Sequence, residues 1–119
     1  MERVTGIGGV FVRSGDPGRL AAWYAEHLGI DPLDAAGGAW EQQAGPTVWA
    51  PFPLDSDYFP PGQQVMLDLR VADLDAMLAQ LRAGGVEVVG DVVEQAGVGR
   101  FAQVVDPDGR RVELWQPED

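Results

Sequence analysis

The sequence predicts an α+β fold, because strand patterns and helix patterns alternate and the same order of elements occurs twice. The chain has 119 residues and is 45% apolar, which suits one globular domain. A shift of 57 residues aligns Val10 with Leu67, Asp16 with Asp73 and Tyr24 with Leu81. Each half therefore reads as a strand, a helix and about three strands. One such unit is too small to bury its own sheet face, so two units should combine.

In the first half, residues 7–13 are rich in β-formers and predict a strand. Asp16 is the expected N-cap of a helix and Pro17 suits its first position. Gly29 ends this helix, and its apolar stripe comprises Leu20, Trp23, Tyr24 and Leu28. Two short strands follow, at 39–43 and 47–52, with a turn at Gly45 and Pro46 between them.

In the second half, residues 65–71 alternate between apolar and other side chains and predict a strand. Asp73 is the expected N-cap of a helix, and Gly84 ends it. Three further strands are expected at 86–93, 100–105 and 111–116. The tetrapeptide from Asp106 to Gly109 predicts the turn between the last two.

The composition excludes several functions. The chain has no cysteine, and its one histidine, His27, lies at the end of a predicted helix, so neither a cysteine zinc site nor a multi-histidine metal site is expected. The formal net charge of −11 argues against nucleic acid as a partner and favours cationic ligands. No apolar run is long enough to span a membrane and no signal peptide is recognised, so we expect a cytoplasmic protein.

The order and spacing of several short motifs carry a family resemblance. The first half has Gly9, the Asp16-Pro17 cap, the Trp23-Tyr24 pair and Gly29. The second half ends on Asp-Pro-Asp-Gly at 106–109 followed by Glu-Leu-Trp-Gln-Pro at 113–117. This layout resembles the vicinal oxygen chelate superfamily, which includes glyoxalase I, bleomycin-resistance proteins and extradiol dioxygenases. The resemblance implies two βαβββ units, at about 5–54 and 64–117, that form a curved mixed sheet around a cleft with helices outside. It also implies a homodimer.

The resemblance further implies where a metal would bind. Many members hold a divalent ion through the first strand of each unit and through the last strand. The matching positions here are Gly9, Met66 and Glu113. Only Glu113 keeps a usual ligand type, because glycine has no side chain and methionine offers a soft thioether. We therefore expect no cofactor, and Glu113 is a metal ligand only if a divalent metal is bound.

Alternation along the strands gives the side chains that face the cleft. Asp68 and Glu113 are the candidate catalytic residues, as a general base or as an anchor for a cation. The alternative for Asp68 is a structural network with nearby arginines. The candidate ligand-binding residues are Phe11, Arg13, Trp40, Trp49, Tyr58, Met66, Arg70, Phe101, Gln103 and Trp115. Trp40, Trp49, Tyr58 and Phe59 either form a stacking wall and a lid, at 51–62, or fill a small core or a dimer interface.

Three functions remain open from the sequence. The first is binding of a small organic ligand, aromatic or cationic, without the usual metal, as in bleomycin-resistance proteins. The second is an enzyme of the same fold, of the lyase, isomerase or dioxygenase type, that uses Glu113 and Asp68 or an atypical divalent metal. The third is a non-catalytic interaction module.

Overall fold

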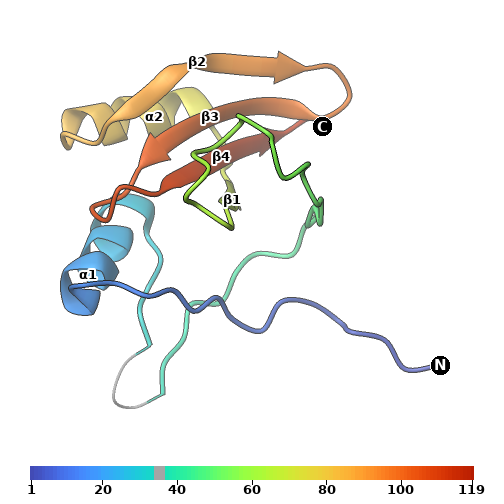
Figure 1. Cartoon of the computed structure of the whole chain (residues 1–119), viewed down its shortest axis with the longest axis horizontal. Coiled ribbons are helices and arrows are strands. Elements are labelled where there is room, and N and C mark those ends of the chain that lie inside the picture. Colours follow the sequence, from blue (N-terminus) through green and yellow to red (C-terminus); the bar gives the residue numbers. More distant parts are fainter. Residues whose placement is uncertain (34–36) are drawn as a thin grey trace.

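The computed structural model describes residues 1–33 and 37–119 (Figure 1). Its described elements are two helices and four strands. In chain order they are α1 (Pro17–Leu28), β1 (Leu67–Arg70), α2 (Leu74–Ala83), β2 (Val88–Gln95), β3 (Gly99–Val105) and β4 (Arg111–Pro117). The fold is mixed α+β, as predicted, and its second half has the predicted strand, helix and three strands.

The four strands form one curved sheet in the order β1-β4-β3-β2 (Figure 1). β1 pairs with β4 in parallel, whereas β4 with β3 and β3 with β2 are antiparallel. The parallel pair is possible because α2 connects β1 to the far side of the sheet. One sheet face is thus covered by a helix, and the other is left to carry polar and aromatic side chains.

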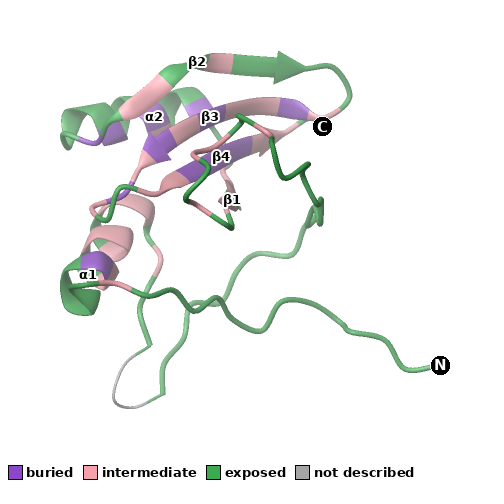
Figure 2. Ribbon diagram, in the orientation of Figure 1, coloured by how far each residue is buried: buried purple, intermediate pink, exposed green. Residues whose placement is uncertain are grey.

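The core lies between α2 and the covered face of the sheet, where the purple residues gather in Figure 2. Leu74, Leu78 and Leu81 of α2 pack on the inward side chains of the two central strands. These are Ala102, Val104, Val112 and Leu114. Leu67, Leu69 and Val71 pack against the same cluster, which confirms the alternation predicted for β1.

Both helices begin and end where the sequence predicts. The side chain of Asp16 accepts a hydrogen bond from the backbone N–H of Arg19, and that of Asp73 accepts one from Ala76. α1 ends at Gly29, whose φ of 70° is a left-handed conformation that favours glycine. The turn at 106–109 is also confirmed, because the N–H of Gly109 donates to the carbonyl of Asp106 at 2.9 Å.

The predicted strands of the first half are wrong within this single chain. Residues 1–16 and 37–66 contain no strand, and Val10, Phe11 and Trp49 are exposed there. The N-terminal segment runs away from the sheet in Figure 1. A strand needs a neighbour for its backbone groups, and the described part of the chain offers these segments none. These segments are rich in β-forming residues, but composition alone does not supply the pairing.

The absence of these pairings is visible in the dimensions of the molecule. Its radius of gyration is 15.0 Å, against about 13.5 Å for a compact domain of this length. β1 is also shorter than predicted, beginning at Leu67 rather than at residue 65. Among the described helices, neither has the length and apolar character needed to cross a bilayer.

Candidate functional site

Two acidic side chains meet on the open face of the sheet, the face opposite α2. β1 and β4 run side by side in a register that pairs Asp68 with Glu113. Glu113 is buried, with 7% of its surface exposed. Asp68 lies on the edge strand and is exposed as a residue, although its carboxyl group is partly desolvated. The two carboxyl groups lie near enough for Glu113 to act on the titration of Asp68. The sequence prediction that these two residues share one site is consistent with this geometry.

The pKa of Asp68 is raised to about 8. Loss of solvent around the carboxyl group is the largest cause, followed by the hydrogen bond and the negative charge of Glu113; the guanidinium of Arg70 acts in the opposite direction. Two carboxylates side by side repel each other, so the neighbouring Glu113 favours the protonated form of Asp68.

Tyr58 lies against this pair. Its hydroxyl donates to Oε2 of Glu113. Burial, followed by the hydrogen bond and charge of Glu113, raises the pKa of Tyr58 to about 12, so the phenol stays protonated and acts as a donor. The backbone carbonyl of Tyr58 accepts a 2.9 Å hydrogen bond from Nε2 of Gln103 on β3. The segment from Phe52 to Gln63 is thus attached to the open face at Tyr58.

A second attachment lies at Gln63, the end of the same segment. Its side chain accepts from the backbone N–H of Arg111 at 2.7 Å and donates to the Arg111 carbonyl at 2.8 Å. Arg111 in turn donates to Oε1 of Gln103 at 3.1 Å. The side-chain amide of Gln103 therefore has protein partners on both sides. It connects the segment from Phe52 to Gln63, at Tyr58, with Arg111 of β4.

An aromatic wall borders the carboxyl pair. The rings of Phe101 and Trp115 are parallel, with an interplanar angle of 5° and centroids 6.0 Å apart. The ring of Tyr58 contacts Phe52 at a centroid distance of 5.7 Å. Between Tyr58 and β2 lies a half-enclosed pocket of about 250 Å³. It is lined by Tyr58, Val89, Gly90, Asp91, Val93, Phe101, Ala102 and Gln103.

The remaining candidates from the sequence lie elsewhere. Arg70 donates to the carbonyl of Gln43 at 2.9 Å, so it ties the middle segment to β1. Met66 immediately precedes β1 and is half-buried. Phe11, Arg13, Trp40 and Trp49 are exposed on the irregular first-half segments, with Phe11 at 96% and Trp49 at 90%. The structure thus brings together Asp68, Glu113, Tyr58, Phe101, Gln103 and Trp115 but not the first-half residues.

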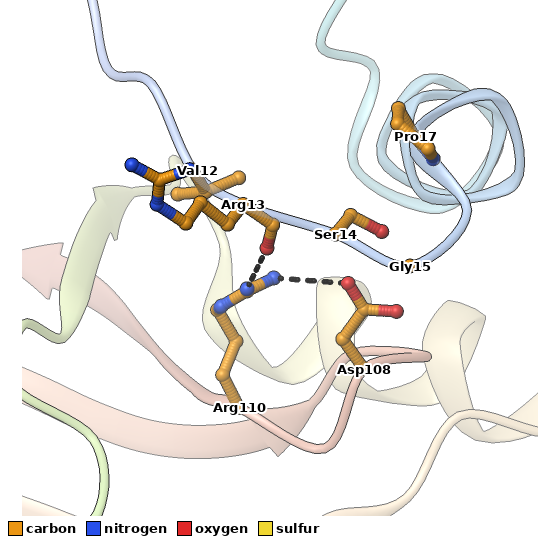
Figure 3. Close-up of a pocket in the computed structure, with 7 residues that line it drawn as sticks. All are labelled: Val12, Arg13, Ser14, Gly15, Pro17, Asp108 and Arg110. Atoms are coloured by element: carbon orange, nitrogen blue, oxygen red, sulfur yellow. Dashed lines mark hydrogen bonds and ion pairs between the residues drawn. The ribbon is translucent and has the colours of Figure 1, made fainter.

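A wider and shallower depression lies beside the N-terminus of α1 (Figure 3). Arg110 projects into it and donates to the carbonyl of Arg13 at 2.9 Å. The same guanidinium lies 3.0 Å from Asp106 and 3.6 Å from Asp108. The side chain of Arg13 points away from this cluster in Figure 3. Arg110 pairs here with Asp106 and Asp108 and also bonds to the Arg13 carbonyl. These contacts connect the turn at 106–109 to the segment that precedes α1.

The family profile described as a glyoxalase-like domain matches residues 9–115. The chain belongs to this glyoxalase-like domain family. It therefore falls in the vicinal oxygen chelate superfamily, as the sequence motifs indicate. A comparison with curated protein sequences gives no match.

Solved structures share the fold of this glyoxalase-like domain. One is TnmS3, an antibiotic-binding protein from Streptomyces sp. CB03234, with 30% identity, a TM-score of 0.65, and coverage of 99% of this chain and 100% of that one. Another is lactoylglutathione lyase from Agrobacterium tumefaciens, at 15% identity and a TM-score of 0.63, covering 97% and 96%. Glyoxalase I of Leishmania major has 21% identity and a TM-score of 0.53, covering 88% and 81%. The last two show the common fold alone.

The donor set of this glyoxalase-like domain does not fit a resident divalent metal of the superfamily type. No group of three or more acidic or histidine side chains is arranged to hold an ion among residues 1–33 and 37–119. The register of β1 and β4 pairs Asp68 with Glu113, and Oε2 of Glu113 accepts a hydrogen bond from the Tyr58 hydroxyl. Divalent ions of this class need several oxygen or imidazole ligands, and the pair supplies only two carboxyl groups, one of them already bonded to a phenol.

The sequence reasoning missed the β2 side of the pocket. Val89, Asp91 and Val93 alternate with Val88 and Val92, which pack against the core. The sequence shows that side chains of this strand alternate between two faces. It does not show which of the two faces borders the pocket. Val89 pairs with Gln103 and Val93 with Phe101, so β2 takes four residue steps where β3 takes two. This bulge, with Gly90 at a φ of 69°, shapes the wall of the pocket and is set by the pairing of the two strands.

Proposed function

We propose that this glyoxalase-like domain binds a small organic ligand on the open face of its sheet, without the metal that many superfamily members carry. The observation that carries the proposal is the pocket between Tyr58 and β2, which adjoins the Asp68–Glu113 pair. Its walls are apolar and aromatic with few polar groups, which is the usual composition of a small-molecule site. The similarity to TnmS3, whose name describes an antibiotic-binding protein, supports the same class of function. A cytoplasmic location stays a prediction from the sequence.

The test of this proposal is a binding screen on the full chain. Antibiotics, bleomycin among them, and simple aromatic compounds are added to ¹⁵N-labelled protein, and amide shifts are followed by NMR. We expect saturable shifts at the pocket, including the backbone of Gly90 and the side-chain amide of Gln103. A matched variant, Val93→Phe, fills the pocket and should abolish them. If a folded protein shows no saturable shift with any compound, the interaction-module function is favoured and the ligand proposal is wrong.

A second candidate function is acid–base catalysis at the same pair. The arrangement of Asp68, Glu113 and Tyr58 favours it. The register of β1 and β4 pairs the two acidic residues, and the Tyr58 hydroxyl donates to Glu113 on the open face. Binding and catalysis are separable. Asp68→Asn removes the titrating acid while the pocket beside β2 keeps its lining, so a catalyst would lose turnover and retain affinity. Unchanged turnover of a bound compound in both Asp68→Asn and Glu113→Gln would rule out this function.

We also infer a homodimer from the first-half segments. Ile7, Phe11 and Trp49 expose 60%, 96% and 90% of their surface, in stretches whose composition predicts strands. Such apolar, unpaired segments favour burial against another chain. We infer that the partner is a second copy of this chain, because the sequence of its other half follows the same βαβββ pattern. Strands of that copy would pair with the first-half segments.

Size-exclusion chromatography with light scattering tests the inference. We expect twice the 12.8 kDa of one chain. Phe11→Ser combined with Trp49→Ser should shift the protein toward monomer, whereas Val93→Ser, at an apolar position on β2 that is 55% exposed, should not. A monomer at all protein concentrations, in the unmodified chain, would overturn the homodimer.

A further inference from the structure

The pocket between Tyr58 and β2 contains a charge that no other group in the described structure pairs with. Asp91 lies on β2, and its side chain makes no hydrogen bond or ion pair with residues 1–33 or 37–119. Its neighbour on the same strand behaves differently, because Glu94 bonds to Nε of Arg100 at 3.2 Å. Asp91 therefore takes no part in the ion pairs that Arg100 makes on this side of the sheet.

The other side chains of the pocket are neutral. None of the eight lining residues is basic, and Asp91 carries the only formal charge among them. The nearby arginine on β4, Arg111, is turned to Gln103, to which it donates at 3.1 Å. The charge of the whole chain is also strongly negative, at −11. The pocket therefore has the electrostatic character that attracts a cation and repels an anion.

The apolar part of the pocket determines the size and shape of the uncharged part of the ligand. Phe101, held parallel to Trp115, forms one wall, and Val89 and Val93 form another. Tyr58 closes the pocket on the side of the carboxyl pair. The volume of about 250 Å³ is smaller than the roughly 300–1,000 Å³ typical of sites for drug-sized molecules. It suits a flat group of one or two rings.

We propose that this pocket binds a flat aromatic group that carries a protonated amine, and that Asp91 is the residue that selects the positive charge. The proposal rests on the ligand-binding function above and specifies its ligand class. The ring lies between Phe101 and the valines of β2, and the ammonium group points to the rim, where it pairs with the carboxylate of Asp91.

The experiment compares three compounds with one ring system: 2-naphthylmethylamine, 2-naphthalenemethanol and 2-naphthoate. Affinities are measured by ¹⁵N NMR titration of the full chain at low salt and pH 7. We expect the amine to bind about fivefold more tightly than the alcohol, the scale of a partly exposed ion pair. The carboxylate should bind most weakly. Added salt should reduce the difference between amine and alcohol.

Two matched variants locate the selectivity. Asp91→Asn keeps the size of the side chain and should equalise the affinities for amine and alcohol. Glu87→Gln makes the same charge change at an exposed position outside the pocket and should leave the preference unchanged. A preference reduced equally by both variants would assign it to the overall charge and overturn the role of Asp91.

The remaining outcomes separate this inference from the proposed function. Equal binding of amine and alcohol to the unmodified chain, with shifts at Gly90, would overturn the charge selection and leave a ligand pocket in place. Binding of the three naphthalenes only elsewhere on the chain, with an antibiotic shifting the pocket amides, would overturn the ring-and-amine ligand class alone. No saturable shift with any compound, including the antibiotics, would overturn both.

Discussion

Replacing Tyr24 by phenylalanine tests how α1 is attached to the rest of the molecule. The Tyr24 hydroxyl donates to Oδ2 of Asp106 at 2.7 Å. Asp106 is buried, with 4% of its surface exposed. Its oxygens also accept from the backbone of Asp108 and from Arg110, so both carboxylate oxygens of Asp106 have partners. Burial, together with the hydrogen bond to Asp106, raises the pKa of Tyr24, so its hydroxyl remains a donor.

The expected loss follows from this arrangement. A hydrogen bond to a charged group contributes about 1.5–3 kcal/mol to the free energy of unfolding. The lower end applies to Tyr24→Phe, because Arg110 still bonds to the same carboxylate oxygen at 3.0 Å. A loss of about 1.5 kcal/mol lowers Tm by about 6 °C in a domain of this size. The phenylalanine ring keeps the packing on the core, so the urea m-value should not change.

The measurement combines urea unfolding with amide hydrogen exchange. Tyr24→Phe should speed exchange in α1 more than in β3 and β4, since the bond joins the helix to the turn between those strands. Tyr58→Phe is the matched control, because it also deletes a phenol hydroxyl bound to a carboxylate but lies outside the helix packing. A Tm change below about 1 °C, with α1 protection equal to that of the unmodified chain, would show that α1 is held by apolar packing alone.

Two further predictions concern the open face of the sheet and the end of the β-hairpin. Because the pKa of Asp68 is raised to about 8, the folded state holds a proton that the unfolded state releases above about pH 4. Its contribution is complete below that pH and is lost as pH rises toward 8. Urea midpoints between pH 5 and 9 should therefore decline in the unmodified chain relative to Asp68→Asn, and parallel profiles would contradict the raised pKa. Gly99 has a φ of 134°, and a Cβ there would overlap the carbonyl oxygen of Gln116. Gly99→Ala should cost about 2–3 kcal/mol of unfolding free energy, and a urea midpoint equal to that of the unmodified chain would show that the hairpin adjusts freely.

The elements that the sequence predicted well are those determined by neighbouring residues. Asp16 and Asp73 cap their helices through bonds to residues three positions later. Gly29 ends α1 because its own backbone conformation favours glycine. The turn at Asp106 likewise depends on contacts within four residues. Such features need no information about the rest of the fold.

The candidate site was predictable where strand alternation and the family motif agreed. Asp68 and Glu113 were assigned to one face from period-two patterns on two strands, and the parallel register brings them together. The partner of Glu113 was harder to identify, because Tyr58 lies 55 residues away in an irregular segment. The bulge that exposes Asp91 to the pocket was not predictable either, since it depends on how β2 pairs with β3. Both depend on long-range contacts that no local pattern encodes.

The difference between local and long-range contacts also explains why the first-half segments form no strands in this chain. Helix α1 forms in the single chain because its hydrogen bonds are internal and Tyr24 anchors it to Asp106. A strand has no such internal bonds, so residues 7–13 and 47–52 are irregular in this chain, where no neighbouring strand pairs with them. Attachment of α1 and pairing of these strands are therefore separate steps. If a second copy supplies the pairing, Tyr24→Phe should weaken the monomer and the dimer alike, whereas Phe11→Ser should weaken the dimer alone.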